Sequence, residues 1–240
     1  VSSGLTTAQV AVLTTQQQVA SLLTTQVEKL TTAQIRALTT DQIQVLTTAQ
    51  IAALTTAQVA QGLTTAQVVA LSTAQIQSLT TAQVVSLSTT NVAALETQDV
   101  AALKTNQIQA LTTSQVAALT TDQVQPGLTT AQIVALTTGQ VSSGLTTAQI
   151  VALSTGQVAA FETQDIAALK TTQIQALSTA QVQAGLTTAQ VVALSTGQIQ
   201  SLTTGQVIAL STTQAAAMET RDVAALKTSQ VAVLTTDQVQ

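Results

Sequence analysis

A leucine recurs every eight residues along almost the whole 240-residue chain, and this spacing constrains the fold more than any other feature. The series begins at Leu5 and ends at Leu234, with Phe161 and Met218 standing in two of the leucine places. Of the 28 intervals between these 29 residues, 23 are eight residues long and five are nine. The unit reads Leu, Thr or Ser, Thr, any residue, Gln, Val or Ile, and two mostly small or polar residues. We therefore expect a single repeat domain over 1–240, without a linker.

A continuous helix or strand cannot bury this pattern. In one long helix, each leucine would be turned by about 80° from the last, so the apolar stripe would wind around the axis. In a strand, the first and sixth places of the unit would face opposite sides, and a strand buried on both sides would carry far fewer Gln residues. We therefore predict an all-α, tightly wound solenoid of very short helices, one per octad. A β-solenoid is the alternative, because Thr and Val favour strands.

The hydroxyl residues of each unit predict where its helix begins. Thr47 and Gln50 have the spacing of a capping box, in which a hydroxyl and an amide side chain satisfy backbone groups at the helix start. The second hydroxyl place is the more invariant, since Thr stays there when the first place changes to Glu, Lys or Leu. We therefore predict Thr24, Thr97 and Thr105 as N-caps and an exposed first place.

Four of the five nine-residue units end in glycine directly before the leucine. They are Gly62, Gly127, Gly144 and Gly185, and Gly4 precedes Leu5 in the same manner. We expect these glycines to take the left-handed conformation that commonly ends a helix. Pro126 predicts that its helix is nearly over at that residue. The fifth long interval holds Gln16, Gln17 and Gln18, and the pattern offers no account of it.

Helices of five to seven residues are too short to be stable alone, since roughly 12 to 15 residues are needed for marginal helicity in water. Successive coils of a solenoid must therefore cover one another. We expect Thr hydroxyls and Gln amides to satisfy the helix ends and the contacts between coils. The sequence leaves the number of octads per coil open, because the unit that begins at Glu96 recurs at Glu162 and Glu219, eight and then seven octads later. Residues 63–107 also resemble residues 186–230 at a constant offset of 123, which indicates growth by duplication.

Composition excludes several classes of function. The chain has no His, Cys, Trp or Tyr, its charged residues amount to 7%, and its net charge is -4. The missing imidazoles and thiols exclude zinc, copper and haem sites, Cys or His nucleophiles and disulfides. We expect no enzyme activity, no catalytic residue, no metal and no cofactor. Six basic residues cannot neutralise nucleic-acid phosphates, and no apolar run is long enough to span a membrane.

Charged residues concentrate in three copies of one group, here called the acidic cassettes. They are Glu96, Asp99 and Lys104; Glu162, Asp165 and Lys170; and Glu219, Asp222 and Lys227. One interpretation makes the carboxylates a cation site or an acid and base pair, since residues three apart share a helix face. We favour a structural interpretation, in which the Asp replaces Gln near a helix N-terminus and the Lys pairs with the Glu across adjacent sides.

The paired Thr residues would form a hydroxyl array along a solenoid. Such an array raises the alternative function of ice or carbohydrate binding. Capping and solvation of the helices account for the same residues, and the first place of each pair varies too much for strict surface matching.

Two resemblances to known families bear on function. Leu63-Thr64-Thr65-Ala66-Gln67-Val68-Val69-Ala70 and its copy from Leu186 resemble the opening helix of TAL effector repeats, which read DNA. The base-reading residues and the Gly-Gly-Lys-Gln loop of that family have no counterpart in this chain, so nucleic-acid binding is a minor alternative. The wider pattern resembles the Thr/Gln-rich octapeptide repeats of very large secreted bacterial surface and adhesin-like proteins. That resemblance covers almost the whole chain and implies an extracellular, structural or adhesive role.

We therefore expect a self-associating structural protein at the cell surface, either a fibre subunit or a rigid spacer. Both ends of the sequence lie within the repeat, so we expect a stretch of a longer array whose uncovered coils stack end to end. Other surface or matrix components are further expected partners. No signal peptide is recognisable at Val1.

Overall fold

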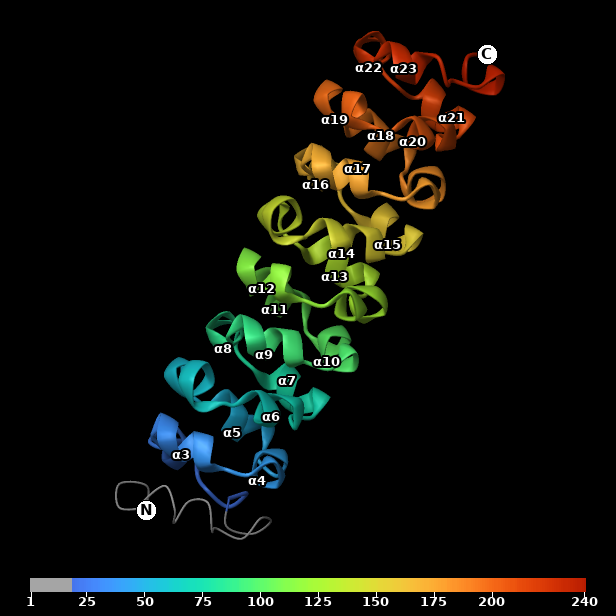
Figure 1. Ribbon diagram of the computed structural model, residues 1–240. Coiled ribbons are helices and arrows are strands. Elements are labelled where there is room, and N and C mark those ends of the chain that lie inside the picture. The colour runs from blue at the N-terminus through green and yellow to red at the C-terminus, as the bar shows by residue number, and fades with distance from the viewer. Residues whose placement is uncertain (1–18) are drawn as a thin grey trace. The chain divides into compact units, whose positions relative to one another are not determined.

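From residue 23 onward, each octad folds into one short helix, and this part of the chain is an all-α solenoid, as the sequence predicts (Figure 1). The computed structural model describes residues 19–240, and strands are absent from this range, which rules against the β-solenoid. The predictions for Gly4 and Gln16 to Gln18 lie outside the described residues. The chain forms two compact units, one ending at Leu119 and the other spanning Thr120–Gln240. The single domain over 1–240 stays a prediction.

The helices of the first unit are α2 (Thr24–Glu28), α3 (Thr32–Ala37), α4 (Thr40–Gln44), α5 (Thr48–Ala52), η1 (Gln58–Gly62), α6 (Thr65–Val69), α7 (Thr73–Ser78), α8 (Thr81–Ser86), α9 (Thr89–Ala94), α10 (Thr97–Ala102), α11 (Thr105–Ala110) and α12 (Thr113–Ala118). Those of the second are η2 (Gln123–Gly127), α13 (Thr130–Ala135), η3 (Gln140–Gly144), α14 (Thr147–Ala152), α15 (Thr155–Ala160), α16 (Thr163–Ala168), α17 (Thr171–Ala176), η4 (Gln181–Gly185), α18 (Thr188–Ala193), α19 (Thr196–Ser201), α20 (Thr204–Ala209), α21 (Thr212–Ala216), α22 (Thr220–Ala225), α23 (Thr228–Val231) and η5 (Thr236–Gln238). The elements η1 to η4 are π-helical turns, and η5 is a 3₁₀ turn.

Three octads make one coil of the solenoid. Within each unit, helices that pack on one another are three places apart along the chain. The three sides of the first unit are α2, α5, α7 and α10; α3, η1, α8 and α11; and α4, α6, α9 and α12. Those of the second are η3, α16, α18, α21 and η5; η2, α14, α17, α19 and α22; and α13, α15, η4, α20 and α23. The acidic cassettes of α16 and α22 are seven octads apart, which three does not divide, so they lie on different sides.

The core is built from the first and sixth places of the octad. Ile76 and Val84 at the sixth place are buried, and so are Leu71 and Leu79 at the first place. Phe161 is buried in its leucine place as well. Burying each such side chain contributes about 1.5–3 kcal/mol, which stabilises helices too short to form alone.

The first hydroxyl of each pair is the N-cap, so the prediction of the second Thr was wrong. Thr47 has the extended backbone of an N-cap, its hydroxyl accepts from the Gln50 N–H at 3.2 Å, and Gln50 Oε1 accepts from the Thr47 N–H at 2.7 Å. The predicted caps Thr24, Thr97 and Thr105 are instead the first helical residues. Their N-cap places hold Leu23, Glu96 and Lys104, none of which caps through its side chain.

The glycines of the long units do not adopt the predicted left-handed conformation, since no described glycine has a positive φ. The extra residue instead widens the last turn into a π-helical turn, and glycine is required there by close packing. A Cβ on Gly62 would lie 3.1 Å from Ile35 Cβ, and one on Gly185 would lie 3.1 Å from Val158 Cβ. Near Pro126 the helix does end as predicted, because Gln125 leaves helical φ and ψ.

Candidate functional site

The most regular polar feature of the molecule is the row of Gln side chains at the fifth octad place, here called the Gln ladder. Gln83 Oε1 accepts from the Thr80 N–H at 2.7 Å, at the start of its own helix. Its Nε2 donates to the carbonyl oxygens of Ile51 and Leu54, at 2.9 and 2.6 Å, in the preceding coil. One buried amide therefore caps its own helix and joins two coils.

The same bonds repeat throughout both units. Gln67, Gln75, Gln107 and Gln115 make them in the first unit, and Gln181, Gln190, Gln198, Gln206, Gln214 and Gln230 make them in the second. Each accepting pair consists of a sixth-place and a first-place carbonyl. These carbonyls lie at the C-terminal end of a short helix and would otherwise lack a donor. The sequence predicts that Gln amides satisfy helix ends and contacts between coils, and the structure identifies the carbonyls that accept from them.

The acidic cassettes interrupt the Gln ladder. Asp99, Asp165 and Asp222 occupy the Gln place and are buried. None of their carboxylate oxygens accepts a hydrogen bond that meets normal geometry. The predicted Glu–Lys ion pairs do not form in the described residues. Glu96 instead accepts from Gln98 Nε2 at 2.6 Å, and Glu162 accepts from Gln164 Nε2.

Burial changes the protonation of two of these carboxyl groups. It raises the pKa of Asp99 to about 6, with a further contribution from the charge of Glu96 and partial relief from the Glu96 backbone amide. Burial also raises the pKa of Asp165, and Glu162 adds to the rise, while the nearby Thr138 hydroxyl and the Glu162 amide offset part of it. Both groups therefore favour the neutral form more than an exposed Asp does.

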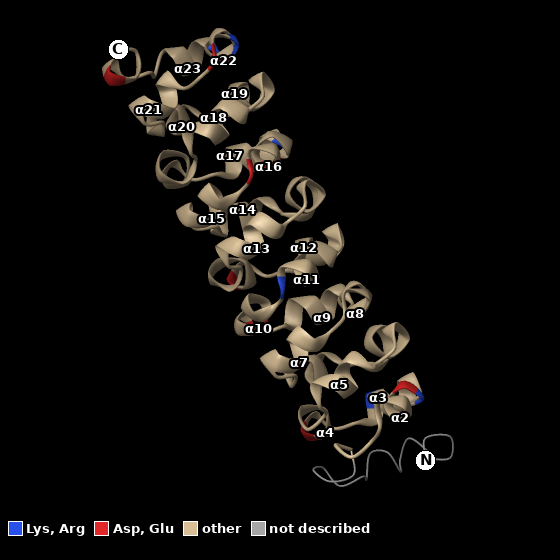
Figure 2. Cartoon of the chain, turned by 180° about the vertical axis from the view of Figure 1, so that it is seen from behind, with Lys and Arg blue, Asp and Glu red and all other residues tan. Residues whose placement is uncertain are grey.

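The third cassette carries its own countercharge. Arg221 replaces the Gln that follows Thr in the other two, and its Nε lies 2.7 Å from Glu219 and 3.8 Å from Asp222. Figure 2 shows the resulting mixture of charges at α22, while most helices of either unit carry no charged side chain. Among residues 19–240, no three His, Cys, Asp or Glu side chains come close enough together to hold a metal ion.

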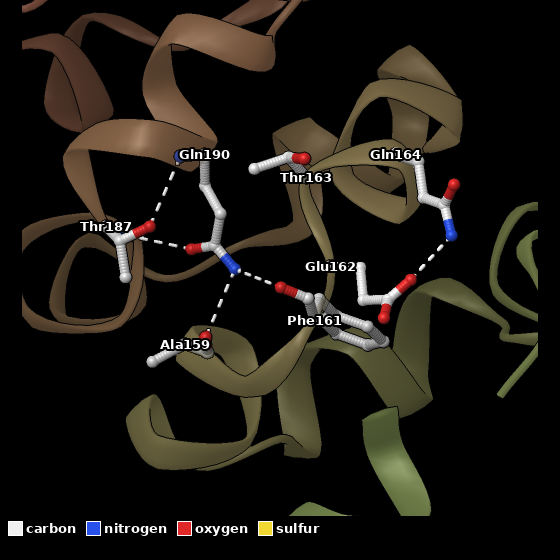
Figure 3. A pocket seen from close by; sticks show the side chains of 7 residues that line it. All are labelled: Ala159, Phe161, Glu162, Thr163, Gln164, Thr187 and Gln190. Atoms are coloured by element: carbon white, nitrogen blue, oxygen red, sulfur yellow. Dashed lines mark hydrogen bonds between the residues drawn. The ribbon is translucent and has the colours of Figure 1, made fainter. Parts of the chain in front are cut away.

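A shallow hollow adjoins the second cassette (Figure 3). It has a volume of about 460 Å³ and is lined by Ala159, Phe161, Glu162, Thr163, Gln164, Thr187 and Gln190. The Gln190 amide within it donates to the backbone carbonyls of Phe161 and Ala159, so it is already used by the Gln ladder. The Glu162 carboxylate is held by Gln164, and no acid and base pair converges in the hollow.

Apolar side chains are uncovered at the last coil of the second unit. Val223 on α22 and Val231 on α23 are 49% and 51% exposed, whereas their sixth-place counterparts Val207 and Ile199 are buried. Together with Met218, Leu226 and Leu234, Val223 lines a hollow of about 270 Å³. We call this surface of α22 and α23 the end face.

Comparison with known families identifies the repeat. The family model of the ALTTAQ repeat matches residues 27–61, 61–89, 92–125, 158–196, 186–220 and 215–240. The chain belongs to the ALTTAQ repeat family. No curated protein matches it. Among solved structures, a weak similarity is found to the leucine-rich repeat-containing protein LegL7 from Legionella pneumophila, at 7% identity and a TM-score of 0.21 over 88% of this chain and 83% of that one.

The ALTTAQ consensus contains the residues that form the core, the N-caps and the Gln ladder. Its Leu fills the core, its first Thr is the N-cap, and its Gln forms the ladder. One stretch that the family model leaves unmatched, residues 126–157, begins at Pro126 and includes the nine-residue unit that ends at Gly144. Within the described part of the chain, no helix is long and apolar enough to cross a membrane.

Proposed function

We propose that this ALTTAQ repeat chain is a non-catalytic structural protein of the cell surface, which associates end to end with further copies of itself as a fibre subunit or rigid spacer. The fit between successive coils is the observation that supports the proposal. Inside each unit, a coil buries the sixth-place side chains of the coil before it, as Val207 and Ile199 illustrate, so one coil of this repeat is a surface that another coil covers.

A second copy supplies the surface that fits the end face. Inside each unit, a following coil covers the sixth-place side chains and donates Gln amides to the carbonyls at the helix ends. The end face offers the same apolar side chains in the same octad register. A coil of the same repeat therefore suits it in both shape and hydrogen bonding, and few surface charges oppose the approach of two chains.

The extracellular location is supported by the resemblance of the octads to those of large secreted bacterial surface proteins. A spacer or fibre requires no cofactor, and the absence of His and Cys from the sequence fits that requirement. Secretion is tested separately, by fractionating the cells that produce the protein.

Sedimentation velocity and electron microscopy over a range of concentrations test self-association. We expect the 240-residue chain to form end-to-end assemblies that grow with concentration, and the double substitution Val223→Lys and Val231→Lys to abolish them. The matched control is Val134→Lys with Val151→Lys, which are 48% and 56% exposed on α13 and α14, away from the end face. A monomer at every concentration, or equal loss in the control, would contradict the proposal.

A further inference from the structure

The buried carboxyl groups of the first two cassettes stand where the Gln ladder requires a donor. In the neighbouring octads of the first unit, Gln107 donates to the carbonyls of residues 76 and 79, which are 31 and 28 positions earlier. The same register places the carbonyls of Val68 and Leu71 opposite Asp99. An ionised carboxylate presents only acceptors to those carbonyls, so the contact between the coils is repulsive in that state.

A shorter side chain at the fifth octad place can still bind the preceding coil when it carries a hydrogen-bond donor. Asn91 occupies the Gln place of α9, and its Nδ2 donates to the Leu63 carbonyl at 3.4 Å. Its Oδ1 accepts from the Thr65 hydroxyl of the preceding coil at 3.3 Å. A neutral Asp carboxyl has the same donor and acceptor pair as Asn, with an O–H in place of the N–H.

Within the described residues, no ion pair involves the carboxyl groups of the first two cassettes. Asp99 faces α7 within the first unit, and α7 has no titratable residue. The helix that carries Asp165, α16, packs between η3 and α18, which also have none, and the Thr138 hydroxyl lies near the Asp165 carboxyl group. On their own elements, the adjacent charges are those of Glu96 and Glu162, which oppose ionisation. Lys104 and Lys170 begin the next helices and form no ion pair with either Asp within the described chain.

We propose that Asp99 and Asp165 take up a proton as the solution becomes mildly acidic. Each neutral carboxyl then donates a hydrogen bond to the preceding coil, so the contact between the two coils becomes stronger in acid. We call these two contacts between coils the joints. Asp222 is the contrasting case, because Arg221 supplies a countercharge. The proposal does not depend on self-association, since both joints lie inside a single chain.

The direction of the pH effect follows from the raised pKa of Asp99, about 6 against an ordinary 3.8, and from the raised pKa of Asp165. At a pH between the ordinary pKa and the raised pKa of these groups, the folded chain binds more protons than the unfolded chain. The stabilisation is therefore complete below the unfolded pKa and is lost as pH rises through the folded pKa.

Thermal unfolding followed by circular dichroism between pH 8 and pH 4.5 tests the joints. We expect the midpoint of the unmodified chain to rise by about 5 °C on acidification. The double substitution Asp99→Asn and Asp165→Asn should raise the midpoint at pH 8 and remove most of this pH dependence. The control, Asp41→Asn with Asp122→Asn, changes charge equally at exposed sites and should keep the dependence.

Infrared difference spectra between pH 5 and pH 8 report protonation directly. A band of protonated carboxyl groups in a dry environment is expected, and it should disappear in the Asp99→Asn and Asp165→Asn variant. A flat or falling midpoint on acidification, or a band that survives the double substitution, would overturn the proposal. So would a rise at pH 8 on adding millimolar calcium that equals the effect of acid, because a cation would then occupy the place of the proton.

Discussion

At the scale of single residues, the fifth octad place decides whether the coils hold together. A Gln side chain there is buried and makes two kinds of hydrogen bond. Its Oε1 caps its own helix, and its Nε2 donates to carbonyl oxygens of the preceding coil. The consensus shows that this Gln is almost invariant, but it gives no direction for the side chain. Only the coil geometry places particular carbonyl acceptors within reach of Nε2. The sequence therefore predicted the Thr47 and Gln50 box and Gln contacts between coils, but not which carbonyls accept from Nε2.

Removing one amide from the Gln ladder should therefore be costly. We expect Gln83→Met to destabilise the chain by about 2–4 kcal/mol, because the substitution leaves the Thr80 N–H and the Ile51 and Leu54 carbonyls without a partner. Denaturant unfolding measures the change. Gln77→Met is the matched control at an exposed place, and an equal loss there would refute the assigned role of the amide.

The choice of N-cap is a second test at this scale. Thr80 caps α8 and Thr81 is its first helical residue, and both are exposed. We expect Thr80→Ala to cost about 1 kcal/mol, since the Gln83 N–H loses its acceptor, and Thr81→Ala to cost much less. Thermal unfolding measures both losses of stability. A larger loss for Thr81→Ala than for Thr80→Ala would show that the second Thr is the N-cap, as its invariance predicted. The invariance of the second Thr gave a wrong prediction because a residue can be invariant for its packing as well as for capping.

At the scale of elements, an octad and a nine-residue unit differ by one residue in the last turn of the helix. The extra residue widens the final turn into a π-helical turn, and the backbone then lies directly against a helix of the adjacent coil. The sequence identified the glycines that end these units and the break at Pro126. It assigned the wrong reason to the glycines, because a close approach to Ile35 or Val158 exists only once the coils are stacked.

Two Gly-to-Ala substitutions in the second unit separate the two explanations. Gly185→Ala should destabilise the chain by about 1–3 kcal/mol, since the new Cβ would lie 3.1 Å from Val158 Cβ. Gly197→Ala, in α19, meets nothing within 4 Å and should stabilise the chain by about 0.5–1 kcal/mol through helix propensity. A stabilising Gly185→Ala would show that the π-helical turn does not pack as described.

At the scale of the whole molecule, the repeat predicts a solenoid but not its pitch. The spacing of Leu and the single aromatic residue, Phe161, both fit a narrow core of small aliphatic side chains. The number of octads per coil depends on the angle between successive helices, which local sequence signals do not specify. The sequence did not decide which sides the cassettes at Glu162 and Glu219 occupy. They lie on different sides, since seven octads are not a whole number of three-helix coils.

Cross-linking of cysteine pairs tests the three-octad coil most directly, because the chain has no native Cys. Gln175, Gln200 and Ile208 all occupy exposed seventh places, on α17, α19 and α20. Since α19 stacks on α17, a short bifunctional thiol reagent should join the pair Gln175→Cys and Gln200→Cys rapidly. The pair Gln175→Cys and Ile208→Cys should remain unlinked. Efficient linking of the second pair instead of the first would indicate four octads per coil and contradict the solenoid described here.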